Sequence, residues 1–548
     1  MSSCIPTHAP LDGKHFDVVV VGGGINGVAM AGECARAGKR TLLVEKSDFG
    51  AGTTSRSSRI IHGGLRYLEH GELGLVRESL RERERLLRSH PHLVRRRKFV
   101  LAVQDGRGMR SALAIRAGLF IYGKIAHVRQ NDFSTTALED SLQVGGKLAC
   151  FDYQDAQCEF PERLVAEWLR AAIRAGAEAR NHTEVLEAKF VNGAMRRLRL
   201  RDALTGDESH VDCDWLINAT GPWADRFCAQ AGVPSRTRMV GGVRGSHIVL
   251  PTFPGAPENP VYTEAQDGRP IFLLPWNSQL LLGTTEVFDD GDPGEAAPSL
   301  HEIDYLLRHL SRLFPNCGLS ARDVRYGFAG IRPLPYAPGE NAAAISRRHV
   351  LFDHAHDGAG GVISVIGGKL TTAAKLARDC VRKIGIKVAE PAIELCAAPS
   401  SDGIDSALEQ WARQMSSAAG ISQASAHAIA EWHGAEALSV TRLAASDPVW
   451  RAFICDHSPH ILAEVAQAMR YEKAITLGDV LLRRVPVALG ACWSEECSHQ
   501  SAEKIGRAFG WTSTRISSEL EQFEAERAAF LHPSEREWRP QLTQSGRR

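Results

Sequence analysis

The sequence lacks the cysteine patterns of a disulfide-rich or zinc-binding protein. Its 548 residues include twelve scattered cysteines with no C-x-x-C pair. The closest two, Cys492 and Cys497, are separated by four residues, a spacing that fits no common zinc pattern. We therefore expect reduced, mostly buried thiols in a cytoplasmic protein, and no metal site.

Long apolar runs, a strong net charge and internal repeats are also missing. The first residues, MSSCIPTHAPLDGKHFD, contain no apolar core of a signal peptide. No stretch approaches the roughly twenty apolar residues that a membrane-spanning helix needs. The formal net charge of +1 gives no basis for nucleic-acid binding. Length and composition, with 44% apolar residues, fit a globular protein of two or three domains.

The strongest feature that is present is a glycine motif between two predicted strands, in residues 16–46. The β-branched run 18–21 predicts a buried parallel strand. Gly22, Gly24 and Gly27 then form G-x-G-x-x-G at the start of a helix over 29–37, which Gly38 ends. Glu45 follows a second strand over 41–44, where a carboxylate can bind a ribose hydroxyl. The stretch predicts binding of FAD or NAD rather than NADP; the alternative is an ordinary glycine-rich turn.

A long polar loop follows in residues 50–72. It is dense in Gly, Ser and Thr and also carries Arg56, Arg59, His62 and Arg66. Such a loop beside a dinucleotide site usually takes part in cofactor binding or chemistry. The alternative is a solvated connection.

The motifs beyond this loop resemble the flavin-dependent glycerol-3-phosphate dehydrogenases, within the wider D-amino-acid-oxidase-like flavoproteins. The resemblance covers residues 15–390, and the last third also looks similar through AMRYEKAITLGDVLLRR at 468–484. Its motifs are SSRIIHGGLRYLEH at 57–70, INATGPW at 217–223, GSHIV at 245–249, GTTE at 283–286, AGIRPL at 329–334 and IGGKLTT at 366–372.

The resemblance implies an α/β fold with three parts. A Rossmann-like FAD-binding domain would comprise residues 14–75, 151–235 and 345–390. An antiparallel-sheet substrate domain would comprise 76–150 and 236–344. Alanine-rich helical patterning predicts a C-terminal α-helical domain over 395–548, with helices near 407–415, 425–433, 460–470 and 517–530. Thr476 and Asp479 resemble a capping box.

The resemblance also implies which residues form the site. Those predicted to bind FAD are Gly22, Gly24, Ile25, Asn26, Gly27, Glu45, Lys46, Thr53, Thr54, Ser55, Ser58, Ile60, His62, Gly63, Ala219, Thr220, Gly221, Gly368, Lys369, Leu370 and Thr371. Those predicted to bind the substrate are Arg66, Tyr67, Arg332, Lys369 and Thr372.

Three of these residues and one histidine are candidates for the chemistry. A phosphate dianion favours a bidentate guanidinium and a second cation, which Arg332 and Arg66 can supply. Lys369 can stabilise negative charge on reduced flavin or hold the substrate. His247 is the candidate base, because histidine titrates near neutral pH. The alternative for His247 is a structural histidine. His62 is expected to lie beside the flavin without a catalytic role.

A basic stretch predicts how the protein meets a membrane. Residues 77–98 contain nine basic and three acidic residues, ending in Arg95, Arg96, Arg97 and Lys98, and the mostly apolar segment 108–123 follows. An interfacial segment and a solvated helix beside a core helix explain this pattern equally well. The resemblance, which implies peripheral binding to the inner face of the cytoplasmic membrane, favours the interface.

Three functions remain open at this point. The first is oxidation of sn-glycerol 3-phosphate to dihydroxyacetone phosphate, with electrons passed to a membrane quinone. The second is oxidation of an amine or 2-hydroxy acid on the same scaffold, and the third is a non-catalytic flavin-binding protein at the membrane. Oxidation of an amine or 2-hydroxy acid needs fewer cations than the candidate site residues supply. A non-catalytic protein is expected to have lost polar residues from the site motifs, and these residues are all present. A homodimer is also left open.

Overall fold

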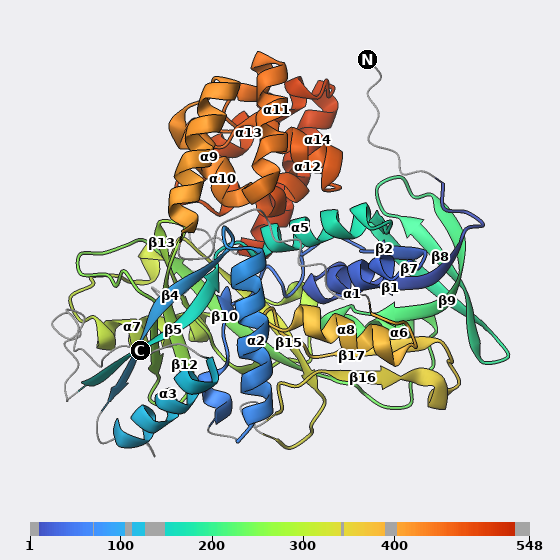
Figure 1. The fold of residues 1–548 in the computed structure, drawn as a ribbon, viewed down its shortest axis with the longest axis horizontal. Coiled ribbons are helices and arrows are strands. Elements are labelled where there is room, and N and C mark those ends of the chain that lie inside the picture. Colours follow the sequence, from blue (N-terminus) through green and yellow to red (C-terminus); the bar gives the residue numbers. More distant parts are fainter. Residues whose placement is uncertain are drawn as a thin grey trace.

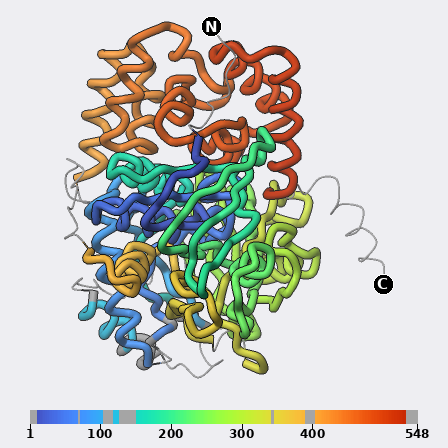
Figure 2. The backbone as a smooth tube through the Cα atoms, turned by 90° about the vertical axis from the view of Figure 1, so that its right-hand side faces the viewer, coloured from blue at the N-terminus to red at the C-terminus, as the bar shows by residue number. Residues whose placement is uncertain are grey.

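The computed structural model describes residues 10–68, 71–104, 112–126, 148–340, 345–388 and 403–531. Two β-sheets with their covering helices lie side by side, and a helical domain packs against both (Figure 1). The view turned by 90° shows the same stacking, with residues 403–531 above the rest (Figure 2).

The first sheet is mainly parallel and contains the glycine motif. Its central strand β1 (His15–Val21) pairs in parallel with β2 (Thr41–Val44) and with β9 (Glu208–Asn218). The outer strands are β6 (Glu178–Arg180), β17 (Val362–Ile366), β16 (Val350–Asp353) and the hairpin of β7 (Thr183–Val191) and β8 (Ala194–Asp202). Its helices are α1 (Ile25–Arg36), α5 (Pro161–Arg174), α6 (Ala224–Ala231) and α8 (Ala373–Lys383). The predicted Rossmann-like fold is confirmed.

The second sheet is mainly antiparallel. It contains β3 (Ile60–Ile61), β4 (Val94–Gln104), β5 (Leu148–Cys158), β10 (Val240–Leu250), β11 (Val261–Glu264), β12 (Pro270–Trp276), β13 (Gln279–Gly283), β14 (Val287–Phe288) and β15 (Tyr326–Pro335). One parallel pair, β4 with β11, interrupts the antiparallel order. Helix α7 (Leu300–Leu313) begins with a capping box formed by Ser299 and Glu302 and packs on this sheet.

The C-terminal domain is helical, as the sequence pattern predicts. Its helices are α9 (Ile404–Ala419), α10 (Gln423–His433), α11 (Ala437–Ser446), α12 (Leu462–Tyr471), α13 (Glu495–Ala508) and α14 (Ser513–Leu531). The predicted capping box is present, because Asp479 N–H donates to Thr476 Oγ1 and Thr476 N–H donates to the Asp479 carboxylate. It starts the π-helical segment Asp479–Arg484.

Buried ion pairs join this helical domain to the first sheet. Arg484 donates two 2.8 Å hydrogen bonds to the Asp48 carboxylate, and Arg483 also binds Asp48. Arg163 on α5 donates at 2.7 Å to Glu472, and both side chains are almost fully buried. Because the removal of one partner would leave a buried charge unpaired, these pairs fix where the domain sits.

The strand pairing shifts one predicted boundary. The predicted cofactor-domain segment 151–235 starts at residue 151. In the structure, residues 151–158 belong to β5, which pairs with β4 along its whole length in the second sheet. The short strand β3, in the predicted cofactor segment 14–75, pairs with the other edge of β5. The chain therefore returns to the first sheet only at α5.

The basic run 95–98 lies on a strand rather than in an interfacial segment. Helix α2 (Leu73–Ser89) ends before it, and Arg95 to Lys98 lie on β4. Each cation has a carboxylate partner, and the pairs are Arg95 with Asp405, Arg96 with Glu84, Arg97 with Glu159 and Lys98 with Asp152. The predicted apolar segment forms α3 (Ala112–Ala126). Among the described helices, none combines the length and apolarity that crossing a bilayer requires.

Candidate active site

A cavity of about 650 Å³ lies where the two sheets and the helical domain meet. The glycine motif and the strand ends of the first sheet line one part of it, and the second sheet contributes His247, Arg332 and neighbouring residues. Arg483, Glu526 and Phe530 line it from the helical domain. Its size is within the range of small-molecule and cofactor sites.

The glycine motif packs as its spacing predicts. Gly22 has a φ of 106°, and a Cβ there would lie 2.5 Å from the carbonyl oxygen of Ala219. A Cβ on Gly27 would lie 1.8 Å from the carbonyl oxygen of Gly22, so α1 can approach β1 only with glycine at that position. Gly24 faces the cavity, and a Cβ there would have only Thr54 Oγ1 nearby, at 3.4 Å. The backbone at Gly24 is thus open to a ligand at the positive end of α1.

Glu45 follows β2 and lines the same part of the cavity. Its carboxylate accepts hydrogen bonds from Gly23 N–H at 2.6 Å and from Ser47 N–H at 2.9 Å. Burial raises the pKa of this carboxyl group, and the two backbone donors act in the opposite direction. The remaining lone pairs of the carboxylate can accept hydrogen bonds from ribose hydroxyls.

A second strand–glycine–helix junction meets the first. Gly367 and Gly368 follow β17 in the left-handed region, and α8 begins a few residues later. Asn26 Nδ2 lies 3.4 Å from the carbonyl oxygen of Gly367, and a Cβ on Gly368 would collide with the Asn26 side chain. Two helix N-termini therefore face one cavity, and both suit an anionic or polar ligand edge.

Two half-buried cations that have no carboxylate partner among the described residues line the cavity. Arg332 donates to Thr284 Oγ1 at 2.9 Å, and within the described residues it forms no ion pair. Burial, and next the neighbouring Arg347, lower the Arg332 pKa to about 10. Lys369 Nζ lies 3.8 Å from the centre of the Tyr67 ring and has no hydrogen-bond partner among the described residues. Burial lowers the Lys369 pKa to about 7.

Two neutral histidines also line the cavity. His247 Nε2 lies 2.8 Å from Ser58 Oγ, its ring stacks on Phe328, and its buried Nδ1 has no partner among the described residues. Burial, followed by the charge of Arg332, lowers the pKa of His247 to about 3. Burial and then the charge of Lys369 lower the His62 pKa to the same value. Both imidazoles are therefore neutral at pH 7, and the low pKa makes each of them a weak proton acceptor.

Glycines of the recognised motifs make room for these side chains. A Cβ on Gly283 would lie 2.3 Å from the His247 ring, and a Cβ on Gly245 would lie 2.6 Å from an Arg332 nitrogen. The glycines of the motifs GTTE and GSHIV thus explain how a histidine and an arginine fit beneath the same cavity.

Most predicted site residues line the cavity. These are Gly22, Gly24, Ile25, Asn26, Glu45, Lys46, Thr53, Thr54, Ser55, Ser58, Ile60, His62, Tyr67, Ala219, Thr220, Gly221, His247, Arg332, Gly368, Lys369, Leu370 and Thr371. Gly27, Gly63 and Thr372 are absent from the lining: Gly27 packs under the turn, Gly63 N–H donates to Tyr122 Oη, and Thr372 is buried at the start of α8. The side chain of Arg66 falls outside the described part of the chain.

Several lining residues were not predicted. Arg347 forms a 3.0 Å ion pair with Glu286 beside Arg332, and Arg56 lies 5.1 Å from the ring of Phe530 on α14. Trp223 belongs to the motif INATGPW and lies under Lys46, so the motif itself could have indicated it. No sequence signal places Phe530, which is 307 residues downstream of Trp223, against the cofactor cavity.

Comparisons with known proteins agree with this geometry. The family "FAD dependent oxidoreductase" matches residues 17–374, and "C-terminal domain of alpha-glycerophosphate oxidase" matches residues 400–516. A Synechocystis protein named glycerol-3-phosphate dehydrogenase is 38% identical over 503 residues, covering 86% of this chain and 89% of its own. A Brucella abortus protein named D-erythritol 1-phosphate dehydrogenase is 36% identical over 382 residues, covering 67% and 73%.

A solved structure shows the same fold over nearly the whole chain. It is described as glycerol-3-phosphate dehydrogenase from Bacillus halodurans complexed with FAD, with a TM-score of 0.75 at 22% identity, covering 95% of this chain and 96% of that one. The open backbone at Gly24, the carboxylate of Glu45 and the two facing helix N-termini fit a flavin dinucleotide. The chain belongs to the family of FAD-dependent oxidoreductases, and FAD is its cofactor.

Proposed function

We propose that this protein oxidises glycerol 3-phosphate to dihydroxyacetone phosphate and passes the electrons to a membrane quinone. The observation that carries the substrate assignment is that two half-buried cations, Arg332 and Lys369, line the same cavity without a carboxylate partner among the described residues. Supporting it, curated relatives that extend over most of this chain are named glycerol-3-phosphate dehydrogenases.

Two unpaired half-buried cations favour an anion of charge −2. Each is costly to bury alone, and the cost is offset when a ligand supplies the opposite charge. The planar guanidinium of Arg332 can bind two phosphate oxygens, while Lys369 contributes a point charge. A carboxylate substrate, as in an amine or hydroxy-acid oxidase, would neutralise only one of the two.

The chain's own residues would then bind the substrate and accept one proton. Bound FAD supplies a two-electron acceptor for the hydride of the secondary alcohol. His247 is the candidate general base because it lies in the same cavity as Arg332; its lowered pKa makes it a weak base until the negative charge of bound phosphate offsets that of Arg332. The hydrogen bond to Ser58 orients the ring.

The Brucella relative raises a second polyol phosphate as a candidate substrate. Erythritol 1-phosphate presents the same phosphate to the two cations and differs in its longer chain. Anaerobic flavin bleaching in single turnover separates the candidates when glycerol 3-phosphate, erythritol 1-phosphate, glycerol and a D-amino acid are compared. Fast bleaching by glycerol 3-phosphate supports the proposal. Preference for erythritol 1-phosphate would reassign the substrate, and preference for an unphosphorylated compound would reject a phosphate site.

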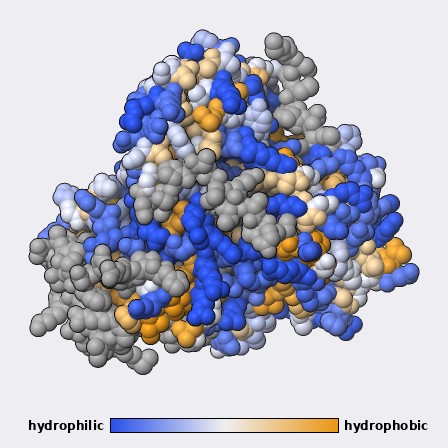
Figure 3. All heavy atoms as spheres, in the orientation of Figure 1, coloured by the Kyte–Doolittle hydropathy of each residue, from blue (hydrophilic) through white to orange (hydrophobic). Residues whose placement is uncertain are grey.

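For the membrane, we propose a docking surface on α3 in place of the basic run on β4. Phe120 and Ile121 on α3 are 63% and 46% exposed. With Ile125 they line a groove whose rim carries three basic residues, Arg77, Arg81 and Lys124. Figure 3 shows the corresponding apolar patch at the lower left, where α3 lies in Figure 1.

Charge and apolar area both favour an anionic lipid surface there. Within the described residues, none of the three rim cations pairs with a carboxylate, whereas every cation of the run 95–98 does. Basic residues near an anionic leaflet contribute about 1 kcal/mol each, and burying a Phe or Ile side chain contributes about 1.5–3 kcal/mol. Because a quinone acceptor lies in the bilayer, the protein must bind the membrane surface to transfer electrons to it.

Vesicle sedimentation tests the surface with matched variants. Phe120→Ser with Ile121→Ser should weaken binding to anionic vesicles at least tenfold and lower quinone turnover, while reduction of a soluble dye stays unchanged. Leu438→Ser, which removes an exposed leucine from α11, should leave binding unchanged, as should the triple change of residues 95–97 to Gln. If the triple variant alone loses binding, the basic run on β4 is the anchor and α3 is not.

A further inference from the structure

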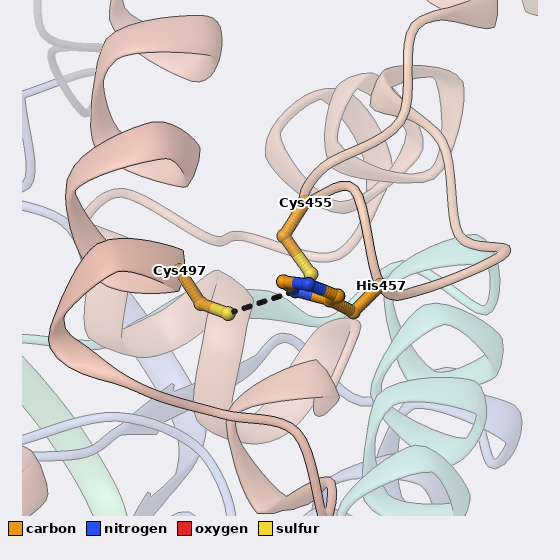
Figure 4. A group of neighbouring side chains, drawn as sticks. All are labelled: Cys455, His457 and Cys497. Carbon is orange, nitrogen blue, oxygen red and sulfur yellow. Dashed lines mark hydrogen bonds between the residues drawn. The ribbon is translucent and has the colours of Figure 1, made fainter.

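Three side chains that can ligate a metal ion meet in the helical domain, and none of them lines the cofactor cavity. Cys455 and His457 lie in the turn that precedes α12, and Cys497 is the third residue of α13. Their ligand atoms all lie within 4.8 Å of one another, and Cys497 Sγ is 3.7 Å from His457 Nδ1. Figure 4 shows the three side chains pointing toward a common centre.

Cys492, in the loop before α13, is a fourth candidate ligand beside these three. Its carbonyl oxygen lies 3.5 Å from Cys497 Sγ, whereas its own sulfur is not among the ligand atoms that all lie within 4.8 Å of one another. Completing the set requires the Cys492 side chain to turn toward the other three. Cys492 and His457 are exposed, while Cys455 and Cys497 are buried. The cluster therefore has a dry side and a side that an ion can reach from solvent.

The surrounding backbone holds these groups in place. Asp456, between the two ligands of the turn, forms a 2.7 Å ion pair with Lys504 on α13. Ile454 N–H donates to the carbonyl oxygen of His460, which closes the turn. Ser494 is the N-cap of α13, and its hydroxyl lies 3.5 Å from Cys497 Sγ.

The same contacts favour a thiolate at Cys497. Ser494 Oγ lies 3.5 Å and His457 Nδ1 lies 3.7 Å from the Cys497 sulfur. A helix N-terminus also favours negative charge. Three thiols and one imidazole are the ligand set of a Cys₃His structural zinc site.

We propose that the helical domain binds one Zn²⁺ ion through Cys455, His457, Cys492 and Cys497. Binding forms three Zn–S bonds and one Zn–N bond, and the thiol protons that remain pass to solvent. No electron is transferred. A disulfide is the competing use of this cluster, but it joins only two sulfurs and gives no role to the imidazole directed at Cys497.

The position of the site gives the ion a structural role. The segment before Cys492 contacts the second sheet, because the carbonyl oxygen of Leu489 accepts hydrogen bonds from Tyr326 Oη at 2.8 Å, Asn277 Nδ2 at 3.1 Å and Gln279 Nε2 at 3.1 Å. An ion that joins this segment to the turn at 455–457 would link α12 and α13 to the part of the helical domain that contacts the second sheet. Zinc would therefore stabilise the domain without entering the reaction.

The test uses untagged holoenzyme purified under reducing conditions, freed of metal with a chelator and titrated with ZnCl₂ or CoCl₂. We expect one Zn²⁺ per chain by elemental analysis and a Tm that rises with zinc. Cobalt should give thiolate charge-transfer bands and tetrahedral ligand-field absorption at wavelengths longer than oxidised flavin absorbs. Flavin reduction by substrate should not change on zinc addition.

Variants identify the ligands and keep the test independent of folding. Cys497→Ser should abolish the thiolate bands, and His457→Asn, at an exposed position, should lower zinc affinity at least tenfold, since loss of even an outer partner of a metal site costs 10–100-fold. His499→Asn on α13 is the matched control and should bind zinc normally. Binding that survives Cys497→Ser, cobalt spectra without thiolate bands, or a disulfide among the three cysteines in reduced, zinc-supplied protein would each overturn the proposal.

Discussion

The buried ammonium of Lys369 should make substrate capture depend on pH within the physiological range. Burial lowers its pKa to about 7, and Glu72 and Glu78 compensate only partly. Because kcat/KM reports the free enzyme, capture of a phosphate dianion should follow the protonated fraction of Lys369. With a pKa near 7 this fraction falls about 100-fold by pH 9. Below about pH 6 the substrate phosphate gains a proton, which completes a bell-shaped profile.

The assay is kcat/KM with glycerol 3-phosphate and a soluble dye between pH 5.5 and 9, with flavin content checked at each pH. Lys369→Met should remove the alkaline limb and hold kcat/KM near the low value of the parent at pH 9. Lys369→Arg should move the alkaline fall of kcat/KM to a pH above 9, because a guanidinium stays charged throughout the assayed range. The pKa values near 3 for His247 and His62 and near 10 for Arg332 leave those groups outside this window. An unchanged alkaline limb in Lys369→Met would refute the assignment.

The same shift predicts an effect on stability with a defined sign. Each factor of ten in proton affinity is worth about 1.4 kcal/mol, so a fall of the Lys369 pKa from 10.5 to about 7 corresponds to at most about 5 kcal/mol. Between these values the unfolded chain binds more protons, so stability should rise with pH from 7 to about 10.5. Lys369→Met should raise the free energy of unfolding below pH 7 and gain little at pH 10. Lys383→Met, at a half-exposed lysine of α8, should show no such dependence.

Four further changes test the site and the domain contact. Gly24→Val should block the backbone that faces the cavity and yield apoprotein, so full FAD occupancy would contradict the assigned turn. Arg332→Ala should lower kcat/KM for glycerol 3-phosphate at least 100-fold, with partial rescue by Arg332→Lys, whose single point charge loses the bidentate geometry. His247→Asn should slow flavin reduction in single turnover by about 10²–10⁴-fold, and fast reduction would make this histidine structural. Asp48→Ala removes the carboxylate partner of buried Arg484, while Arg483 keeps Asp479 and Glu526, and should lower the free energy of unfolding by about 3–5 kcal/mol, measured by urea denaturation.

The sequence predicted the first sheet because its signals are local. A β-branched strand, a glycine turn and a helix start lie within thirty residues, and Gly22 and Gly27 each have a steric reason that the backbone bears out. Arg332 and Lys369 were predicted from motifs, but their lack of carboxylate partners depends on packing. A composition that supplies one acid for almost every base does not show which cations remain unpaired.

The errors have a common physical cause, which is that pairing between distant residues leaves no periodic signal. The run 95–98 is basic in sequence, yet its partners come from residues 84, 152, 159 and 405. Strand β5 begins at the end of the predicted substrate-domain segment 76–150 and continues beyond it. It pairs with β4 in the second sheet rather than with the first sheet. The spacing of the cysteines alone does not reveal the cluster of Cys455, His457 and Cys497, because its members come from two separate segments and one of them is a histidine.

The helical domain is therefore part of the cofactor cavity rather than an appendage. Arg483 binds Asp48, which lies in the segment after β2, and also binds Glu526 at 2.6 Å on α14. Arg483, Glu526 and Phe530 line the cavity, and Phe530 packs near Arg56 of the polar loop. One arginine thus connects the end of β2 to the helix that closes the cavity. Because that connection consists of buried charge pairs, loosening the domain would expose the flavin site and unpair charges at the same time, so domain docking and cofactor binding should be lost together.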